Sequence, residues 1–420
     1  MIMTGVDDWD RQKWDSELAK CQVLVMIHQV LLDALSRGYI RIPNLALIII
    51  DECHHAVKNH CYSKIMRDWY HKAKENLEEL PKILGLSASI VVKSVNEDEF
   101  KAEKAKLEAV LDAEVETCDE FSIEKFVSFA ETKLLKYPAN MTSCKTEIVT
   151  QRIQSIARET KMELLKIKTE KVKQVLHFIP NKNNQATALE CLKKDYKFYS
   201  NTIIGSAEAL VDLGLYSLFV MRDCLQEELD TKSSRSDFYD VGVKEELEVV
   251  ARNGLGLMLD VVSKEFRGLR ESETEKIRKY SCSKLLKLFE IIEMKGFGSL
   301  RAEMRCIIFV ERKLTARALV FLIWRMELTS VKDVGFIHST SAGRSVKDPR
   351  DREDVSLETR KMSETLQKFR EGRINVLVST SVVEEGIDVP SCNLVIKFDF
   401  PQTFRSFVQS RGRARQKGSR

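Results

Sequence analysis

Residues 48–55 read IIIDECHH, and this stretch decides the fold that we expect for the chain. The apolar residues at 48–50 end abruptly in two carboxylates, Asp51 and Glu52, and a histidine pair follows them. Such a run is typical of a buried strand in a parallel sheet, and ligands of such sheets collect beyond the carboxyl ends of the strands. We therefore expect Asp51 and Glu52 to hold a metal ion, with Glu52 also acting on water. This arrangement suits cleavage of a nucleotide phosphoanhydride.

The composition indicates a globular chain with more than one domain. Its 420 residues suit two or three domains, and 44% of them are hydrophobic. No apolar run reaches the roughly 18 residues of a membrane span, and the charged residues 7–13 do not fit a secretory signal peptide. Ten cysteines without CxxC pairs indicate reduced thiols in the cytosol or nucleus, and we expect a cytoplasmic protein. The net charge of +4 excludes a globally basic nucleic-acid binder. Any affinity for nucleic acid must therefore come from local clusters, such as the basic residues of 405–420.

The pattern of apolar residues predicts an α/β part, a helical part and a second α/β part. In the first part, 1–140, strands are expected at 23–27, 45–50 and 83–86, and helices at 29–36, 60–80 and 97–118. Strands that alternate with helices indicate βαβ units and a parallel sheet.

The middle part, 141–278, shows apolar residues at helical spacing and contains only one proline, at 180. We expect an all-helical module with turns at 181–184 and 231–236. Gly254 and Gly256 are expected to interrupt its last helix.

The α/β pattern returns in the third part, 279–420. Strands are expected at 306–310, 334–337, 374–378 and 394–398, helices at 314–326 and 357–370, and a mobile loop at 339–354, which contains Pro349.

Two sequence motifs of the first part resemble motifs of a known protein superfamily. The DECH residues 51–54, followed after another strand by Ser87-Ala88-Ser89, resemble the DExH box and the third motif of superfamily 2 helicases. The resemblance implies that Asp51 helps to hold Mg²⁺, that Glu52 orients or deprotonates the attacking water, and that Ser87 and Ser89 couple nucleotide state to nucleic acid. For the tetrapeptide alone, a helix cap after a strand is an equally good reading.

Residues 379–390 resemble motif V of the same superfamily, with Thr, Gly and Asp in register. The resemblance implies that Ser379 and Thr380 bind backbone phosphate and that Asp388 contacts the nucleotide ribose. Gly386 permits a close approach of the backbone where a side chain would collide.

Residues 409–415, QSRGRAR, resemble motif VI, which implies that Gln409, Arg413 and Arg415 reach the γ-phosphate of ATP across a cleft. An isolated RGRAR is more often a solvated or RNA-binding basic run, and it is the spacing from motif V that favours the catalytic reading. The motif is one residue shorter than the commonest spacing of the superfamily, so Arg415 is placed less firmly than Arg413.

Two further segments resemble contacts to nucleic acid. Residues 23–29 are similar to motif Ib, in which Gln29 would contact the tracking strand, although Ile27 stands where the family usually has threonine. Residues 309–312 resemble motif IV.

Two local clusters have alternative readings. Cys53, His54, His55, His60 and Cys61 lack the paired spacing of a structural zinc site, which favours packing and solvent-facing histidines. The aromatic segment 69–71 suggests base stacking but is more typical of a helix that packs on a sheet.

The arrangement as a whole resembles the RIG-I-like branch of superfamily 2, and within it the helicase region of Dicer, most closely the arthropod Dicers that process long double-stranded RNA. This implies two RecA-like parallel-sheet domains with an all-helical domain between them, ATP and Mg²⁺ as cofactors, and duplex RNA as the partner, together with RNA-binding partner proteins and no membrane. The helical domain would clamp the duplex, which proteins recognise mainly by backbone shape.

Two absences qualify this expectation. No GxxxxGK[ST] phosphate loop occurs in the sequence, and no RNase III carboxylate cluster, PAZ-like segment or double-stranded-RNA-binding domain is present. We therefore expect an incomplete first domain, a second domain truncated after motif VI, weak or no ATP hydrolysis and no RNA cleavage. The alternatives are an ATPase-deficient RNA-binding or regulatory fragment, a RIG-I-like RNA sensor, and a DNA-remodelling helicase.

Overall fold

The computed structural model describes twelve stretches of the chain, which form two compact units. The described residues are 2–3, 9–87, 89–90, 96–117, 131–138, 144–179, 181–233, 243–294, 304–337, 349–380, 392–401 and 403–414. The first unit contains residues 1–127 and 401–409, and the second contains 128–400 and 410–420.

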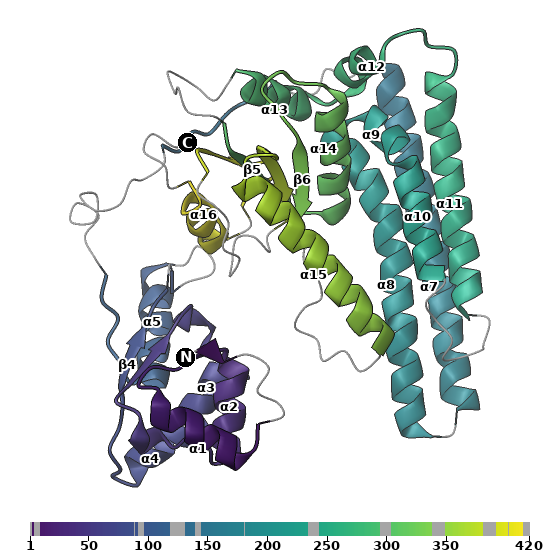
Figure 1. Ribbon diagram of the computed structural model, residues 1–420. Helices are drawn as coiled ribbons and strands as arrows, with labels where there is room; N and C mark the ends of the chain where they lie inside the picture. Colours follow the sequence, from purple (N-terminus) through teal and green to yellow (C-terminus); the bar gives the residue numbers. More distant parts are fainter. Residues whose placement is uncertain are drawn as a thin grey trace. The chain divides into compact units, whose positions relative to one another are not determined.

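The first unit is built from short parallel strands and helices (Figure 1). Its strands are β1 (Ile2–Met3), β2 (Val25–Met26), β3 (Leu47–Ile50) and β4 (Lys82–Gly85), and its helices are α1 (Arg11–Lys20), α2 (His28–Ser36), α3 (Cys61–Ile65), α4 (His71–Glu75) and α5 (Glu97–Leu111). A π-helical turn over Met66–Tyr70 joins α3 to α4, and 3-10 turns lie at Ile42–Asn44 and Cys53–His55. The parallel pairs are β1 with β2 and β3 with β4, as the sequence predicts for a βαβ arrangement.

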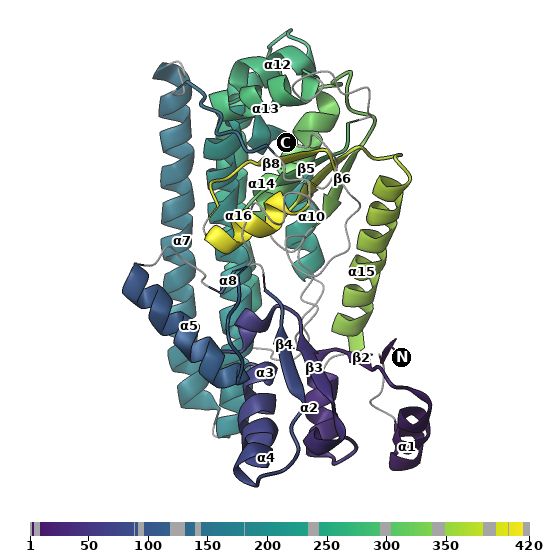
Figure 2. The ribbon, with the colours of Figure 1, turned by 90° about the vertical axis from the view of Figure 1, so that its left-hand side faces the viewer.

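The core of the first unit lies on one face of β3 and β4. Figure 2 shows these two strands beside the helices α2 and α3. Ile48 and Ile50 are buried there with Met66 and Tyr70, so the aromatic segment 69–71 packs against the sheet as expected. The opposite face of β3 is uncovered, because Ile49 is 57% exposed and Leu47 is 49% exposed. The expectation that this apolar run is buried on both faces is therefore wrong for two of its residues.

The helices of the second unit form a long antiparallel module. They are α7 (Cys144–Phe178), α8 (Lys182–Leu213), α9 (Leu215–Val220), α10 (Arg222–Ser233), α11 (Val243–Phe266), α12 (Glu273–Tyr280) and α13 (Ser283–Glu293). α7 and α8 lie side by side over most of their length (Figures 1 and 2). Asn181 caps α8 through its side chain, which accepts from the amide of Asn183 at 2.9 Å, so the turn expected at 181–184 is confined to the start of a helix. The turn expected at 231–236 also begins within a helix, because α10 extends to Ser233.

Gly254 and Gly256 lie within the continuous helix α11, so the expected interruption is wrong. A Cβ atom at Gly254 would lie 2.3 Å from Oγ1 of Thr160 on α7. The glycine thus allows two helices to approach closely instead of ending one of them. A second glycine, Gly214, joins α8 to α9 at φ +104°, where a Cβ atom would lie 2.2 Å from the carbonyl oxygen of Tyr280.

The sheet of the second unit has four parallel strands in the order β6-β7-β5-β8. These are β5 (Cys306–Phe309), β6 (Val334–Ile337), β7 (Val376–Ser379) and β8 (Leu394–Lys397), with helices α14 (Lys313–Arg325) and α15 (Pro349–Arg370). Helix α16 (Phe404–Arg411) follows in the chain, and its residues up to Gln409 belong to the first unit. The loop expected at 339–354 is wrong from Pro349 onward, where α15 begins, because proline is tolerated in the first turn of a helix. Residues 339–348 lie outside the described part of the chain.

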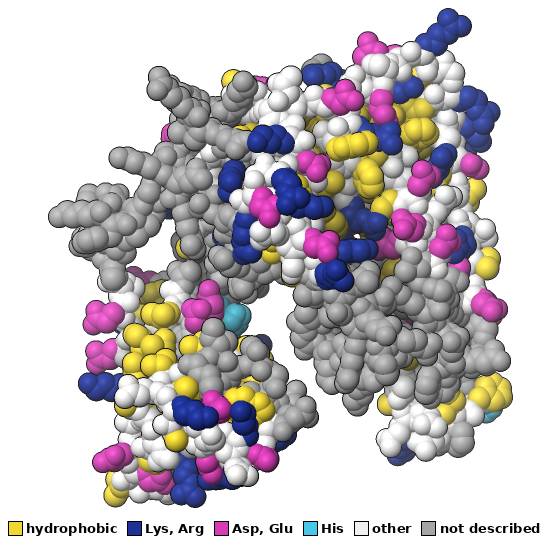
Figure 3. Space-filling model, in the orientation of Figure 1, with side chains coloured by type: hydrophobic (Ala, Val, Ile, Leu, Met, Phe, Trp, Pro, Cys, Tyr) yellow, Lys and Arg dark blue, Asp and Glu magenta, His cyan; other side chains and the backbone are white. Residues whose placement is uncertain are grey.

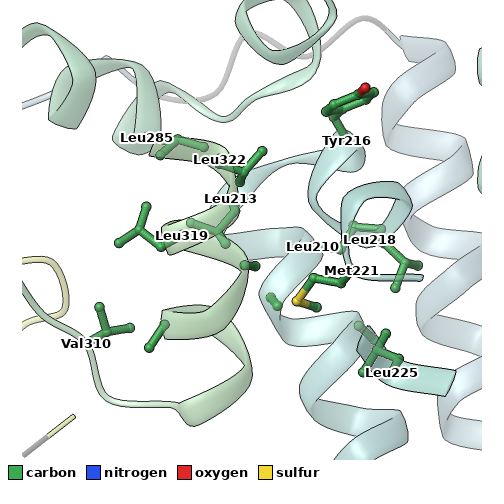
Figure 4. Packing of buried hydrophobic residues seen from close by; sticks show 14 of the residues in the cluster. Leu210, Leu213, Tyr216, Leu218, Met221, Leu225, Leu285, Val310, Leu319 and Leu322 are labelled. Carbon is green, nitrogen blue, oxygen red and sulfur yellow. The ribbon is translucent and has the colours of Figure 1, made fainter. Parts of the chain in front are cut away.

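The two faces of this sheet are covered by different helices. Ile308 and Val378 join one large core with α14 and with the helical module, whereas Ile307 and Leu377 pack with Phe369 of α15. Figure 4 shows the first of these cores, where leucines of α14 meet α8, α9 and α10. The helical module and the sheet therefore share one hydrophobic core, and the division of the chain into 1–140, 141–278 and 279–420 stays a prediction.

Charges on the visible surface are mixed. Figure 3 shows Lys and Arg interspersed with Asp and Glu over the described part of the second unit. This agrees with the small net charge of +4 and gives no reason to expect a single basic face there.

Candidate functional site

The DECH turn is fixed by backbone hydrogen bonds that continue the pairing of β3 with β4. Leu86 donates its amide to Ile50 at 2.9 Å, and Cys53 donates its amide to Leu86 at 2.9 Å. Between them Glu52 takes the left-handed conformation, with φ 50° and ψ 47°. For a residue with a side chain this backbone conformation costs about 1–2 kcal/mol, so the surrounding bonds must hold it.

Glycine at position 85 brings this turn close to β4. A Cβ atom there would lie 2.8 Å from the sulfur of Cys53, which is 5% exposed. Burial also raises the pKa of the Cys53 thiol, so it is a packing group and not a reactive thiolate. Gly85 was not among the predicted site residues, although a glycine at a strand end is a recognisable signal of close backbone approach.

His54 joins the second carboxylate to the loop after β4. Its side chain is buried, and its Nδ1 lies 2.8 Å from Oγ of Ser87 and 3.2 Å from Oε2 of Glu52. Ser87 donates its hydroxyl to the carbonyl of Ser89 at 2.9 Å, so it accepts from His54, and Nδ1 of the imidazole carries the proton. The structure thus brings together Glu52, Ser87 and Ser89, three of the residues that the sequence singled out.

Asp51 is exposed at the carboxyl end of β3 and folds back on the turn, since its Oδ1 accepts the amide of Glu52 at 3.0 Å. Its own carbonyl oxygen accepts the hydroxyl of Tyr62 at 3.0 Å. Tyr62 was missed by the sequence analysis, because nothing in the local pattern connects α3 with this turn.

The carboxylates of Asp51 and Glu52 suit a Mg²⁺ ion that is also bound by substrate phosphates. Among the described residues no group of three or more His, Cys, Asp or Glu side chains could hold a metal ion. Mg²⁺ is usually bound by one or two carboxylates with substrate phosphates and water as the other ligands. Asp51 and Glu52 match that donor set, so they suit a metal that arrives with a nucleotide.

Gln29 lies on α2 and is held by two side chains. Its Nε2 donates to Asp33 at 2.8 Å, and its Oε1 accepts the thiol of Cys61 at 3.2 Å. The side chain is exposed, so the predicted contact with nucleic acid stays open to it.

In the second unit, Ser379 and Thr380 end the central strand β7. Ser379 is fully buried, and its hydroxyl donates to the carbonyl of Thr380 at 2.8 Å. A phosphate contact by Ser379 would therefore require this hydroxyl to turn. Thr380 is 7% exposed, and its Oγ1 has no hydrogen-bond partner among the described residues. A buried hydroxyl of this kind is better placed than Ser379 to accept an incoming ligand.

The segment that resembles motif IV ends in a network of charges. Asp399 accepts the amide of Glu311 at 2.7 Å and pairs with Lys284 at 2.7 Å. Arg312 pairs with Asp212 of α8 at 3.2 Å. Burial raises the pKa of Asp212 despite the nearby cations of Lys284 and Arg312. This network fixes the ends of β5 and β8 against the helical module.

The last predicted group is only partly described. Gln409 lies on α16, and its Nε2 has no hydrogen-bond partner within the described ranges. The carbonyl oxygen of Arg413 accepts the buried thiol of Cys392 at 3.2 Å. Gly386, Asp388 and Arg415 lie outside the described residues, so their roles stay predictions.

Two helicase families match the chain, one at each end. The DEAD/DEAH box helicase family matches residues 2–97, and the helicase conserved C-terminal domain matches residues 283–418. The long helices α7, α8 and α11 lie between the matched parts. In the described part of the chain no helix is both long and apolar enough to span a membrane.

Similar proteins include Dicers of plants and animals. Endoribonuclease Dicer homolog 2a of Oryza sativa subsp. japonica is 28% identical over 99% of this chain and 27% of its own length. Endoribonuclease Dicer homolog 2 of Arabidopsis thaliana is 31% identical over 99% and 28%, and Endoribonuclease Dicer of Gallus gallus is 30% identical over 97% and 22%. The chain thus spans less than a third of the length of each of these relatives. Among solved structures, the helicase domain of Pyrococcus furiosus Hef has 20% identity and a TM-score of 0.46, covering 100% of this chain and 78% of that chain.

Proposed function

This chain carries a DEAD/DEAH box helicase domain and a helicase C-terminal domain and corresponds to the helicase region of Dicer-like proteins, and on that basis we propose that it acts on double-stranded RNA with ATP. In the whole protein this region would bind duplex RNA and move along it during small-RNA production and RNA silencing. We also propose that the protein is cytoplasmic, that it works with RNA-binding partner proteins, and that it is most similar to the arthropod Dicers.

The contact between Glu52, His54 and Ser87 is the observation that carries the proposal. Glu52 would orient the attacking water and take its proton, and the imidazole of His54 lies between this carboxylate, at 3.2 Å, and the hydroxyl of Ser87, at 2.8 Å. Asp51 would bind the Mg²⁺ that accompanies ATP, and that ion supplies charge neutralisation on the phosphates. A shift of the Ser87–Ser89 loop would thus move the imidazole of His54 and change the surroundings of the Glu52 carboxylate.

Other predicted residues would contribute the remaining contacts. Thr380 supports a phosphate contact, because its buried Oγ1 has no partner among the described residues. We assign Gln29, Ser87, Ser89 and Ser379 to the same nucleic-acid path. Gly386 and Asp388 would bind the nucleotide, and Gln409, Arg413 and Arg415 would stabilise charge on its γ-phosphate.

A passive role is the second candidate, and one observation favours it. The 420 residues contain no GxxxxGK[ST] sequence, whose backbone amides and lysine normally cradle the β- and γ-phosphates. The chain by itself would then bind RNA and regulate without turning over ATP.

Two assays on the 420-residue chain separate these candidates. ATP hydrolysis is measured with and without duplex RNA, and RNA binding is measured in parallel. We expect duplex binding with weak turnover, and loss of any RNA-stimulated turnover by at least about 100-fold in Glu52→Gln, the size of a general-base contribution. Glu97→Gln is the matched control, because Glu97 is an exposed residue of α5 that pairs with the exposed Lys101. RNA-stimulated turnover that survives Glu52→Gln would refute the assigned role, and binding without any turnover would favour the passive one.

A further inference from the structure

Three histidines and a tyrosine pack together beside the DECH turn, and the proposed function uses none of them. The ring of His60 lies 4.8 Å from that of His28, 5.5 Å from that of His55 and 4.8 Å from that of Tyr62. His28 also contacts Tyr62, at 5.4 Å between ring centroids. These residues come from three elements, namely α2, the turn after Glu52 and the start of α3. The cluster therefore connects two helices to the candidate site.

Tyr62 connects this cluster to the backbone of the carboxylates. Its hydroxyl donates to the carbonyl oxygen of Asp51 at 3.0 Å. That carbonyl belongs to the peptide before Glu52, and the amide of Cys53 after Glu52 is bonded to Leu86 at 2.9 Å. The left-handed residue Glu52 is thus held by a hydrogen bond on each side, one from β4 and one from Tyr62.

His60 fixes Tyr62 in turn, because it is the N-cap of α3. Its Nδ1 accepts the amide of Tyr62 at 3.3 Å. This bond requires a lone pair on Nδ1, which a neutral imidazole protonated at Nε2 has and an imidazolium lacks. Protonation of His60 would therefore break the cap and release the first turn of the helix that carries Tyr62.

The surroundings of His60 favour the neutral form. Burial lowers the pKa of His60 from its usual 6.5, and the imidazoles of His28 and His55 lower it further. Burial and His55 likewise lower the pKa of His28. The carboxylates of Asp51 and Glu52 face Tyr62, whose pKa is raised mainly by burial, so the tyrosine keeps the proton that it donates.

We propose that Tyr62 is a positioning residue for the Asp51–Glu52 turn and that His60 keeps it in place only as a neutral imidazole. The importance of this contact for catalysis rests on the proposed role of the two carboxylates, but the contact itself does not. The turn is held at neutral pH. It is released as pH falls below about 6.5 toward the lowered pKa of His60, because the proton that breaks the cap binds there.

Hydrogen–deuterium exchange of the 420-residue chain without nucleotide tests the proposal. Protection of amides 52–56 is measured at pH 7.5 and about pH 5.5, relative to the intrinsic exchange rate at each pH, with strand β7 as the internal reference. Tyr62→Phe should lower protection of 52–56 about five-fold at both pH values, as expected for the loss of one hydrogen bond, and leave β7 unchanged. In the wild-type chain protection should be complete at pH 7.5 and should decrease as the pH falls toward the lowered pKa of His60.

Two further variants make the result specific. His60→Asn keeps a good N-cap acceptor that cannot be protonated, so it should retain wild-type protection at both pH values. Tyr70→Phe is the matched control. It removes the hydroxyl of a tyrosine in the π-helical turn after α3, which donates to Asp112 at 3.1 Å, and it should not change the protection of amides 52–56. Unchanged protection in Tyr62→Phe, or an acid-induced loss in His60→Asn equal to that of the wild type, would overturn the proposal. The measurement needs no turnover, so a chain without ATP turnover would favour the passive candidate and leave this result intact.

Discussion

Gly254 and Gly256 stand two positions apart on α11, yet only the first faces another helix. A Cβ atom at Gly254 would lie 2.3 Å from the Thr160 hydroxyl oxygen, whereas a Cβ atom at Gly256 would meet no atom of the described residues within 4 Å. The sequence alone does not distinguish the two glycines, because the local pattern of residues does not show which of them contacts another helix.

Alanine substitutions should separate these two environments. We expect Gly254→Ala to destabilise the chain by about 1–3 kcal/mol through overpacking against Thr160. Gly256→Ala should stabilise it by about 0.5–1 kcal/mol, because alanine loses less backbone entropy in a helix. Urea unfolding followed by circular dichroism measures both changes. Equal effects of the two substitutions would show that interhelical space does not govern this position.

Strand β3 differs from strands β5 and β7, although all three are apolar runs. Every residue of β5 and β7 is buried, because α14 covers one face of their sheet and α15 the other. In β3 only Ile48 and Ile50 are buried. The positions of these strands could be predicted from their composition, but the cover on each face could not, because it depends on elements distant in sequence.

Substitutions on the two faces of β3 should differ in the same way. Ile48→Ala should destabilise the first unit by about 2–5 kcal/mol, the usual range for a truncated core isoleucine. Ile49→Thr should change stability by no more than about 0.5 kcal/mol and should reduce binding of a hydrophobic dye such as ANS. Thermal unfolding and dye fluorescence provide the two readings. A large loss of stability in Ile49→Thr would mean that this face is covered in solution.

The candidate site was predictable to the extent that it is local in sequence. The position of Asp51 and Glu52 at a strand end follows from one apolar run, and the pairing of β3 with β4 then brings Ser87 to the same edge. The bond from Tyr62 to Asp51 and the cap formed by His60 depend on how α3 packs, and no spacing encodes that contact.

The second unit shows how far the helical module and the sheet depend on one another. α7 to α13 share a core with α14 and with β5, β7 and β8, and Arg312 pairs with Asp212 at the border between the two parts (Figure 4). Gly205 of α8 lies close to Leu314 of α14, where a Cβ atom would approach the leucine to 2.8 Å. Parts that share one core normally unfold together.

We therefore expect the second unit to unfold in one cooperative step. In native-state hydrogen exchange at increasing urea, the slowest amides of α8 and β7 should converge on the same free energy of opening. Amides of β7 that open at a lower free energy than those of α8 at every urea concentration would contradict this expectation. They would show that the sheet melts while the helical module persists.

The left-handed turn at Glu52 has a consequence for how this region can change over generations of mutation. Glycine would adopt that conformation without steric penalty, so the wild-type glutamate gives up about 1–2 kcal/mol of folding stability at this position. Selection for stability alone would favour its replacement, and selection for chemistry would oppose it. A chain in which Glu52 persists is therefore one whose fitness depends on what this carboxylate does and not only on how well the domain folds.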